Sequence, residues 1–210
     1  MKRIEDLKFQ IESGCRFCNP PEKERILMET DNFYVMVSLG PIVEGYLLIV
    51  AKKHIGACLN IPKFILDEYI LLKEKVREIL VTTYGCCLFY EHGKIGTSLT
   101  MNNSHEHCYH AHLHCIPVSC ELNKIVCNEI SGHVYHDYNE CYKDMNDKKQ
   151  YLYIEDTKIM TYIPQNPIRR QYLRYKLAST LGYNERWDWV DNQNWNLIDQ
   201  TINKLKPVFK

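Results

Sequence analysis

Alternating apolar and polar residues predict an antiparallel sheet in the first part of the chain. The runs RILMET (residues 25–30), NFYVMVS (32–38) and GYLLIVAKKH (45–54) have the composition and length of strands. Asp31 and Asn32, where the first two runs meet, are residue types that suit a hairpin turn. The third run is almost entirely apolar, which indicates a strand near the centre of the sheet.

One long amphipathic helix is predicted next, within residues 61–80. Its apolar residues recur at spacings of three and four, which is the period of a helix with one buried face. These residues are Ile65, Tyr69, Leu72, Val76 and Ile79. Asn60 is expected to cap the start of the helix, and Gly85 ends the helical pattern. Because a further strand follows in CCLFYEHG (86–93), we expect the helix to cover one face of the sheet.

Three histidines alternate with apolar residues in the stretch CYHAHLHCIP (108–117). This period of two predicts a strand whose His110, His112 and His114 rings all project to the same side. Successive residues on one face of a strand lie roughly 6.5 to 7 Å apart, so the outer two lie about 13 Å apart. That separation is too large for both to bind one zinc ion with bonds of about 2.0 to 2.1 Å. At least one of the three rings must therefore serve another purpose.

The pattern weakens after about residue 119, where two elements can still be predicted. YLYIE (151–155) and KIMTYI (158–163) have the character of a hairpin, and RRQYLRYKLASTLG (169–182) that of a helix. We therefore predict an α+β protein with an antiparallel sheet, a long covering helix, and a C-terminal extension made of a hairpin and a helix.

Charge and composition exclude several classes of protein. Lys plus Arg equals Asp plus Glu at 26 each, and the isoelectric point is about 7.1. No overall positive field therefore attracts nucleic acid or an anionic membrane, and a polyanion must bind at a local site. The first ten residues lack the apolar segment of a signal peptide, and no apolar run approaches the roughly 18 residues of a membrane span. We expect a cytoplasmic, intracellular protein with no membrane association.

Ten cysteines are scattered along the chain, and no export signal accompanies them. Disulfide frameworks are typical of much shorter secreted modules. We expect most of these cysteines to be reduced thiols that fill space in the core. The clearest examples are Cys58, Cys86, Cys87 and Cys115.

The ordered set of motifs resembles the histidine triad (HIT) superfamily of nucleotidyl hydrolases and transferases. The resemblance covers about residues 12–118 and is carried by CRFC (15–18), GYLLIVAKKH, the long helix and HAHLHCIP. It implies a HIT-like domain with an N-terminal Cys-x-x-Cys knuckle over residues 1–118. Residues 119–210 would form a C-terminal extension packed on this domain.

A narrower branch of HIT-like proteins resembles this chain in its EHG motif and in a Gln-x-x-Arg helix followed by Trp-Asp-Trp. The tryptophans are Trp187 and Trp189. Many HIT enzymes hold the ribose hydroxyls with an acidic residue at the end of the second strand, where this chain has Ser38. The resemblance implies a substrate-binding set made of Ser38, Glu91, His92, Gly93, Gln171 and Arg174.

Two triad histidines receive chemical roles from this resemblance. Neutral imidazole is nucleophilic near pH 7 and can leave again from phosphorus. By its place in the motif, His112 would attack the α-phosphorus of a nucleotide ester, anhydride or phosphoramidate and form a nucleotidyl-histidine intermediate. His114 would contact the phosphate oxygens and stabilise developing charge. The alternatives are hydrogen-bonded histidines without chemistry, or a catalytically silent HIT-derived accessory module that binds a nucleotide or RNA.

A structural zinc site is the second implication of the resemblance. Cys15 and Cys18 have the spacing of a zinc knuckle, but no second Cys-x-x-Cys completes a site. HIT-like proteins with this motif complete the site with the KH histidine and the first triad histidine, which here are His54 and His110. The ion would attach the N-terminal segment to the strand that carries the nucleophile. The alternative is a pair of free thiols near a core histidine.

Charged and polar residues outside these motifs do not identify a single binding partner. Arg170 and Arg174 share a helix face and could neutralise a polyphosphate or an RNA end, although a solvated basic face is the commoner explanation. His105 and His107 are expected in a polar loop before the triad. The expected partner is a nucleotide or nucleotide conjugate, and RNA and a homodimer remain compatible with the sequence.

Overall fold

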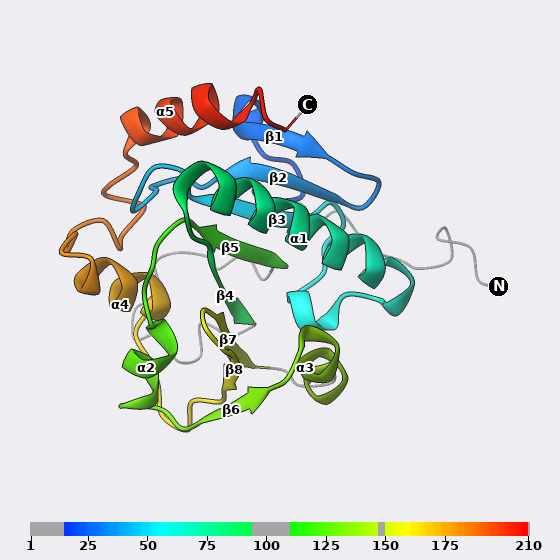
Figure 1. Ribbon diagram of the computed structural model, residues 1–210, viewed down its shortest axis with the longest axis vertical. Helices are drawn as coiled ribbons and strands as arrows, with labels where there is room; N and C mark the ends of the chain where they lie inside the picture. Colours follow the sequence, from blue (N-terminus) through cyan, green and yellow to red (C-terminus); the bar gives the residue numbers. More distant parts are fainter. Residues whose placement is uncertain (1–14, 94–109, 147–149, 210) are drawn as a thin grey trace.

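An eight-stranded sheet forms the centre of the computed structural model, which describes residues 15–93, 110–146 and 150–209 (Figure 1). Every strand pair is antiparallel, and the order is β1-β2-β3-β5-β4-β7-β8-β6. The strands are β1 Ile26–Glu29, β2 Phe33–Val37, β3 Leu47–Ala51, β4 Leu88–Gly93, β5 His112–Ile116, β6 Gly132–Tyr135, β7 Tyr151–Glu155 and β8 Ile159–Tyr162. The predicted α+β class with a large antiparallel sheet is confirmed.

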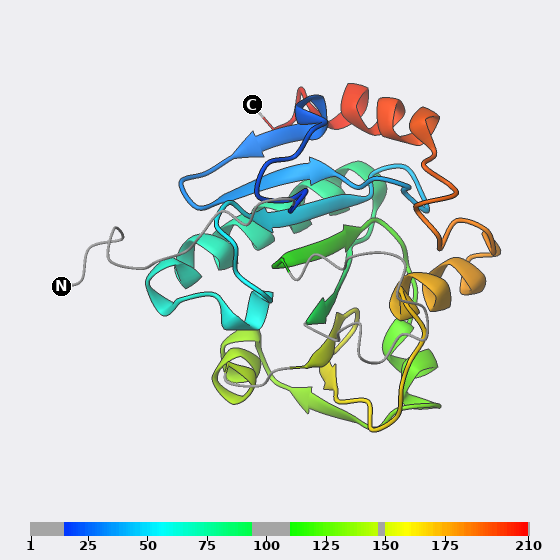
Figure 2. The ribbon, with the colours of Figure 1, turned by 180° about the vertical axis from the view of Figure 1, so that it is seen from behind.

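Helices cover both faces of this sheet. They are α1 Lys63–Tyr84, α2 Leu122–Cys127, α3 Tyr138–Met145, α4 Tyr172–Thr180 and α5 Trp195–Leu205, with short 3-10 helices at Lys23–Arg25 and Cys58–Asn60. Helix α1 crosses in front of the strands in Figure 1 and behind them in Figure 2. Buried side chains of α1, α3 and α5 share one hydrophobic core, and those of α2 and α4 share another. No helix in the described part of the chain is both long and apolar enough to cross a membrane.

Strand β5, which carries the triad, lies between β3 and β4 in the middle of the sheet. His114 is directly opposite Leu48 of β3 and Tyr90 of β4. Because side chains alternate along a strand, Leu113 and Cys115 enter the core under α1. The rings of His112 and His114 project to the other face, where α2 and α4 pack.

The predicted apolar face of the long helix is buried as expected, but the predicted start of that helix is wrong. Helix α1 begins at Lys63, after Pro62, and no side chain caps it. Asn60 instead ends a 3-10 helix, and Ile61 is extended, with φ −58° and ψ 131°. A residue that precedes proline is disfavoured in the helical region, so the helix cannot extend back past Pro62.

The C-terminal hairpin joins the main sheet. Strand β7 pairs with β4, β8 pairs with β7, and β6 completes the edge. The sheet is therefore continuous across residue 118, where the sequence analysis divided the chain. Strand β6 and helices α2, α3 and α5 were not expected from the hydrophobic pattern.

Four cysteines expected as reduced core thiols are free in the structure. Cys58 and Cys115 are buried, and Cys86 and Cys87 are partly buried. Burial raises the pKa of Cys87 to about 12 and places that of Cys115 well above its usual value. These thiols are therefore protonated and unreactive near neutral pH.

A buried ion pair joins α1 to the C-terminal hairpin. Lys73 is only 2% exposed, and its ammonium group pairs with Glu155 of β7 and lies 4.6 Å from the centre of the Tyr138 ring. Arg77, one turn further along α1, pairs with the other carboxylate oxygen of Glu155. Burial raises the pKa of Glu155, but the charges of Lys73 and Arg77 more than offset that effect and hold the pKa below its usual value.

Replacing Lys73 by Met should therefore lower the free energy of unfolding by about 3–5 kcal/mol, because it leaves a buried carboxylate only partly compensated. Urea unfolding at pH 7 measures this difference. The matched control is Lys75→Met on the exposed side of the same helix, which should cost less than about 0.5 kcal/mol.

The same comparison has a defined pH dependence. Since the pKa of Glu155 is lower in the folded than in the unfolded state, its contribution is present above the unfolded value of 4.5 and is lost as pH falls through the folded value. The difference between wild type and Lys73→Met should shrink in acid. Equal stability of the two proteins at pH 7 would contradict a stabilising pair.

Candidate active site and metal cluster

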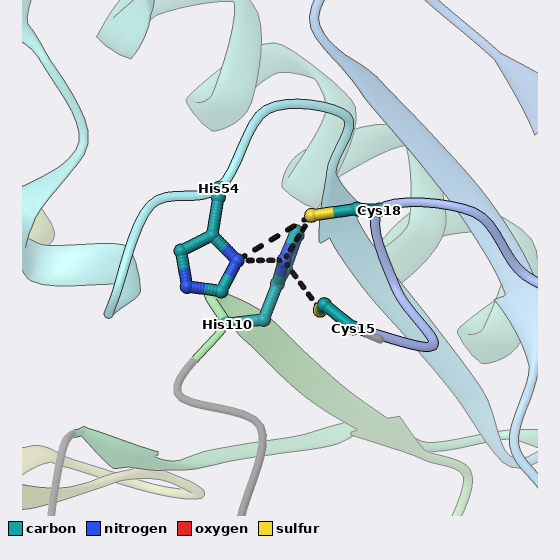
Figure 3. A group of neighbouring side chains, drawn as sticks. All are labelled: Cys15, Cys18, His54 and His110. Atoms are coloured by element: carbon teal, nitrogen blue, oxygen red, sulfur yellow. Dashed lines mark hydrogen bonds between the residues drawn. The ribbon is translucent and has the colours of Figure 1, made fainter. Parts of the chain in front are cut away.

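Cys15, Cys18, His54 and His110 each bring one sulfur or ring nitrogen to a common point (Figure 3). His110 Nδ1 lies 3.4 Å from Cys15 Sγ, 3.6 Å from Cys18 Sγ and 3.3 Å from His54 Nδ1. All four ligand atoms lie within 4.8 Å of one another. A tetrahedral zinc ion with bonds of about 2.3 Å to sulfur and about 2.0–2.1 Å to nitrogen requires ligand atoms roughly 3.3–3.8 Å apart. These residues could therefore hold a metal ion.

The His110 ring is oriented so that a lone pair faces this cluster. Its Nε2 lies 2.5 Å from the carbonyl oxygen of Ala51, which can only accept a hydrogen bond. Nε2 must therefore carry the hydrogen, which leaves the Nδ1 lone pair directed at the cysteines. Burial lowers the pKa of His110 to about 4, so the ring is neutral near pH 7. A metal-binding histidine typically has its second nitrogen held in this way.

Three separate segments supply the cluster. His54 follows β3, His110 precedes β5, and the two cysteines belong to the N-terminal knuckle, where the Tyr34 hydroxyl of β2 donates to the Phe17 carbonyl at 2.7 Å. Cys18 is a free thiol, whereas Cys15 is disulfide-bonded in this structure. Metal binding through Cys15 therefore requires that bond to be reduced.

His112, the predicted nucleophile, lies at the start of β5 and is partly exposed. Its Nδ1 lies 2.6 Å from the carbonyl oxygen of His110, so Nδ1 carries the hydrogen and Nε2 has a free lone pair. Burial lowers its pKa, which favours the neutral, nucleophilic ring at pH 7. The ring of Phe17 stacks on it, with centroids 4.7 Å apart and an interplanar angle of 28°. Sequence reasoning missed Phe17, although its place between the two cysteines was a usable signal.

His114 is enclosed by two tyrosines. Its Nδ1 lies 2.8 Å from the Tyr46 hydroxyl, and the Tyr90 ring stacks on it with centroids 4.5 Å apart. The His112 and His114 rings meet edge to face, with centroids 4.9 Å apart. Burial places the pKa of His114 well below its usual value, and the charges of neighbouring cationic groups lower it further. Neutral His114 therefore has one donor and one acceptor nitrogen.

The EHG motif divides between the two faces of the sheet. Glu91 lies on the face under α1, where its carboxylate accepts hydrogen bonds from the Cys58 amide at 2.7 Å and the Tyr151 hydroxyl at 2.6 Å. His92 lies on the triad face, and its Nε2 accepts a hydrogen bond from the Leu173 amide at 3.0 Å. His92 thus joins β4 to helix α4.

Ser38 and Gly40 lie in the loop after β2, and Gly40 is next to Trp189. Ser38 is 3% exposed, and its amide donates to the Tyr46 carbonyl at 2.9 Å. Gly40 has a positive φ of 60°, and a Cβ atom there would lie 2.5 Å from Cβ of Trp189. The C-terminal segment therefore packs directly on the loop that carries Ser38, the position where many HIT enzymes have a ribose-binding acid.

Arg174 lies in the interior of the protein and not on a solvated face. It is 4% exposed, and its guanidinium donates to the carbonyl oxygens of Gly40 at 2.5 Å, Arg186 at 3.0 Å and Trp187 at 2.9 Å. Arg170 pairs with Asp188. Arg174 thus attaches the C-terminal segment to the loop after β2, and the Arg170–Asp188 pair lies within that segment.

Gln171 precedes α4 as its N-cap residue and has the left-handed conformation, with φ 53°. Its side-chain amide lies 3.4 Å from Asp188 Oδ1, and among the described residues its Oε1 has no hydrogen-bond partner. Non-glycine residues adopt this conformation at a cost, often near functional sites. His105 and His107 lie outside the described residues.

The family comparison finds a match over residues 4–130 to the family described as "Protein similar to CwfJ C-terminal". Adenosine 5'-monophosphoramidase HNT1 of Saccharomyces cerevisiae is 27% identical over 120 residues, which cover 55% of this chain and 70% of that protein. The matched family segment contains the cysteine knuckle and the whole triad strand. It ends before the Gln-x-x-Arg helix, so the narrower branch stays a prediction.

Two solved structures are similar at a lower level. Yeast Ap4A phosphorylase Apa2 in complex with Ap4A is 13% identical with a TM-score of 0.46, and the match covers 91% of this chain and 80% of that one. A hypothetical histidine triad nucleotide-binding protein from Sulfolobus tokodaii is 17% identical with a TM-score of 0.40, over 91% and 94% of the two chains.

Taken together, the family match and the yeast relative support the assignment to the histidine triad superfamily. The family match alone extends over more than half of the chain, from before the knuckle to beyond the triad strand. This protein therefore belongs to the family described as "Protein similar to CwfJ C-terminal".

Proposed function

We propose that this protein is a nucleotidyl hydrolase or transferase that acts at the α-phosphate of a nucleotide conjugate through a nucleotidyl-histidine intermediate. The observation that supports this most is the hydrogen bond from His112 Nδ1 to the carbonyl oxygen of His110, at 2.6 Å. That bond directs the lone pair of Nε2 away from the backbone. A ring that served only to fill the core would not need one nitrogen fixed and the other left on the partly exposed side.

Attack by His112 Nε2 forms a nitrogen–phosphorus bond while the bond from phosphorus to the leaving group breaks and the leaving group departs with its electron pair. The imidazole then carries a positive charge, which the carbonyl of His110 stabilises through the Nδ1 hydrogen. His114 donates a hydrogen bond to a phosphate oxygen as negative charge develops there. Water, phosphate or another acceptor then resolves the intermediate.

The yeast relative supports the choice of the first substrate class to test. That protein is an adenosine 5'-monophosphoramidase, so nucleoside phosphoramidates are the first substrates to test. We assign substrate contacts to Ser38 and His92, which share the triad face, to the backbone of Gly93, and to Gln171 at the start of α4. Glu91 and Arg174 act on the substrate indirectly, by holding the strand and the helix that carry these groups.

We further propose that Cys15, Cys18, His54 and His110 bind one structural zinc ion when Cys15 is reduced. The separations between their ligand atoms support this, as does the orientation of His110. The ion would fold the N-terminal knuckle onto the start of β5 and so place Phe17 against His112, the proposed nucleophile. Its role is structural, because all four tetrahedral positions are taken by protein ligands.

The catalytic proposal predicts that His112→Asn loses turnover by at least about 1000-fold, while ligand binding and thermal stability change little. The nitrogen–phosphorus bond forms only along the reaction path and contributes little to the ground-state complex. A screen of nucleoside phosphoramidates, dinucleoside polyphosphates, adenylylated proteins and capped RNA identifies the substrate. His136→Asn, at a highly exposed histidine outside the site, is the matched control.

An intermediate-trapping experiment separates the enzyme from a binding module. Labelled substrate should remain on wild-type protein after an alkaline quench and be lost after an acid quench, because the phosphorus–nitrogen bond to imidazole is acid-labile. Tight nucleotide or RNA binding without turnover and without a trapped label would contradict catalysis and favour the accessory-module alternative.

The metal proposal predicts about one zinc ion per chain in protein purified under reducing conditions without chelator. Chelation should then lower the melting temperature, because the binding free energy contributes to folding. Cys18→Ser should lose the zinc, whereas Cys127→Ser, at an exposed free cysteine, should retain it. Reduced protein that contains no zinc by elemental analysis would contradict the metal proposal.

A further inference from the structure

A buried row of hydroxyl groups extends from His114 toward helix α4. The Tyr46 hydroxyl lies 2.8 Å from His114 Nδ1 and 2.5 Å from the Tyr90 hydroxyl. Both tyrosines are fully buried, at 0% exposure. Neither has a part in the reaction proposed above, and buried hydroxyls are costly unless each finds a partner.

Arg174 lies beside this row, next to Tyr46. Its guanidinium carbon lies 5.3 Å from the centre of the Tyr46 ring. The three carbonyl bonds of Arg174 use Nε and Nη2, and the guanidinium carries a further NH₂ group at Nη1. Burial raises the pKa of Tyr46 and Tyr90, and both the charge and the side-chain hydrogen bonds of Arg174 oppose that increase at each tyrosine. The donor-only Arg174 cation therefore lies beside this tyrosine pair.

The direction of the row follows from counting hydrogens. Arginine can donate hydrogen bonds but cannot accept them, and each hydroxyl has a single hydrogen to give. Arg174 therefore cannot take the Tyr90 hydrogen, and Tyr90 gives it to Tyr46. Tyr46 must then give its hydrogen to the remaining acceptor, His114 Nδ1.

The reverse direction leaves a hydrogen without an acceptor. If His114 Nδ1 carried the hydrogen and donated to Tyr46, then Tyr46 would donate to Tyr90. The Tyr90 hydrogen would then need another acceptor, and within the described residues its hydroxyl has no recorded partner other than Tyr46. A buried O–H group without an acceptor is unfavourable, so the first direction is preferred.

We propose that Tyr90 and Tyr46, with the Arg174 cation beside them, form a one-way hydrogen-bond chain that holds His114 in the tautomer with its hydrogen on Nε2. The chain makes the three residues positioning residues for His114. That His114 uses this hydrogen on a phosphate oxygen rests on the proposed function, whereas the tautomer itself does not. Arg174 belongs to the C-terminal extension. The extension thereby acts on His114 through the tyrosine pair, and Arg174 itself does not contact the substrate.

Nitrogen-15 NMR of histidine-labelled protein tests the chain directly and needs no activity. In wild type, His114 should show a hydrogen on Nε2 and an unprotonated Nδ1. Tyr46→Phe should remove this preference and give a mixture of tautomers. The control is Tyr162→Phe, which lies in the same core but bonds to Asn123 and should leave the His114 signals unchanged.

A second variant keeps the test decisive if Tyr46→Phe does not fold. Tyr90→Phe leaves the bond between Tyr46 and His114 in place but removes the donor that orients it, so it should shift the tautomer in the same direction by a smaller amount. Arg174→Lys retains a donor-only cation and should preserve the tautomer better than Arg174→Met. A hydrogen on Nδ1 of His114 in wild type would overturn the proposal.

Kinetics then separate this proposal from the proposed function. With an active enzyme, Tyr46→Phe should lower kcat about 10- to 100-fold with little change in KM. In a His114→Ala background the same change should cost less than about twofold, because its effect passes through His114. Equal losses in both backgrounds would assign Tyr46 a merely structural role. Absent turnover in wild type would refute the proposed function and leave the NMR result to decide the chain.

Discussion

The central position of β5 is the constraint on which the rest of the site depends. The strand has a hydrogen-bonded neighbour on each side and packed side chains on each face, so its imidazoles lose most of their contact with water. Burial accordingly lowers the pKa of His110, His112 and His114. A neutral buried imidazole has one donor and one acceptor nitrogen, and each must meet a fixed partner. The identity of that partner, and not the ring itself, determines what each histidine can do.

Each ring meets a different partner, which is how one repeated residue can serve three purposes. The Ala51 carbonyl takes the Nε2 hydrogen of His110, so its Nδ1 turns to the cysteines. The His110 carbonyl takes the Nδ1 hydrogen of His112, so the opposite nitrogen keeps its lone pair. At His114 the partner is the Tyr46 hydroxyl, which can either donate or accept a hydrogen bond. The position of the hydrogen on His114 is therefore set by the next partner of Tyr46, the Tyr90 hydroxyl. The first two assignments depend on local backbone, whereas the third depends on distant side chains.

This difference explains which parts of the molecule could be predicted from sequence. Period-two and period-3.6 patterns predicted the strands through β5 and the buried face of α1, because both patterns are local. The metal cluster came from a family resemblance, since nothing in the spacing of Cys18 and His110 shows that they meet. Tyr46 and Tyr90 look like ordinary core aromatics in their strands, and only the pairing of Tyr90 with His114 across β4 and β5 reveals their polar role. Strand β6 escaped detection because three of its four residues are exposed and carry no alternating pattern.

The EHG motif has a physical reason that sequence reasoning did not supply. Glu91 and His92 point to opposite faces of β4, so the strand is tied at one point both to the core under α1 and to helix α4. The Tyr151 hydroxyl reaches Glu91 from the neighbouring strand, and a Cβ atom at position 93 would lie 2.1 Å from the Tyr151 ring. Any residue other than glycine at position 93 would therefore displace the tyrosine that holds Glu91. Since the same strand carries Tyr90 against His114, a disturbance in the core under α1 would reach the triad through β4.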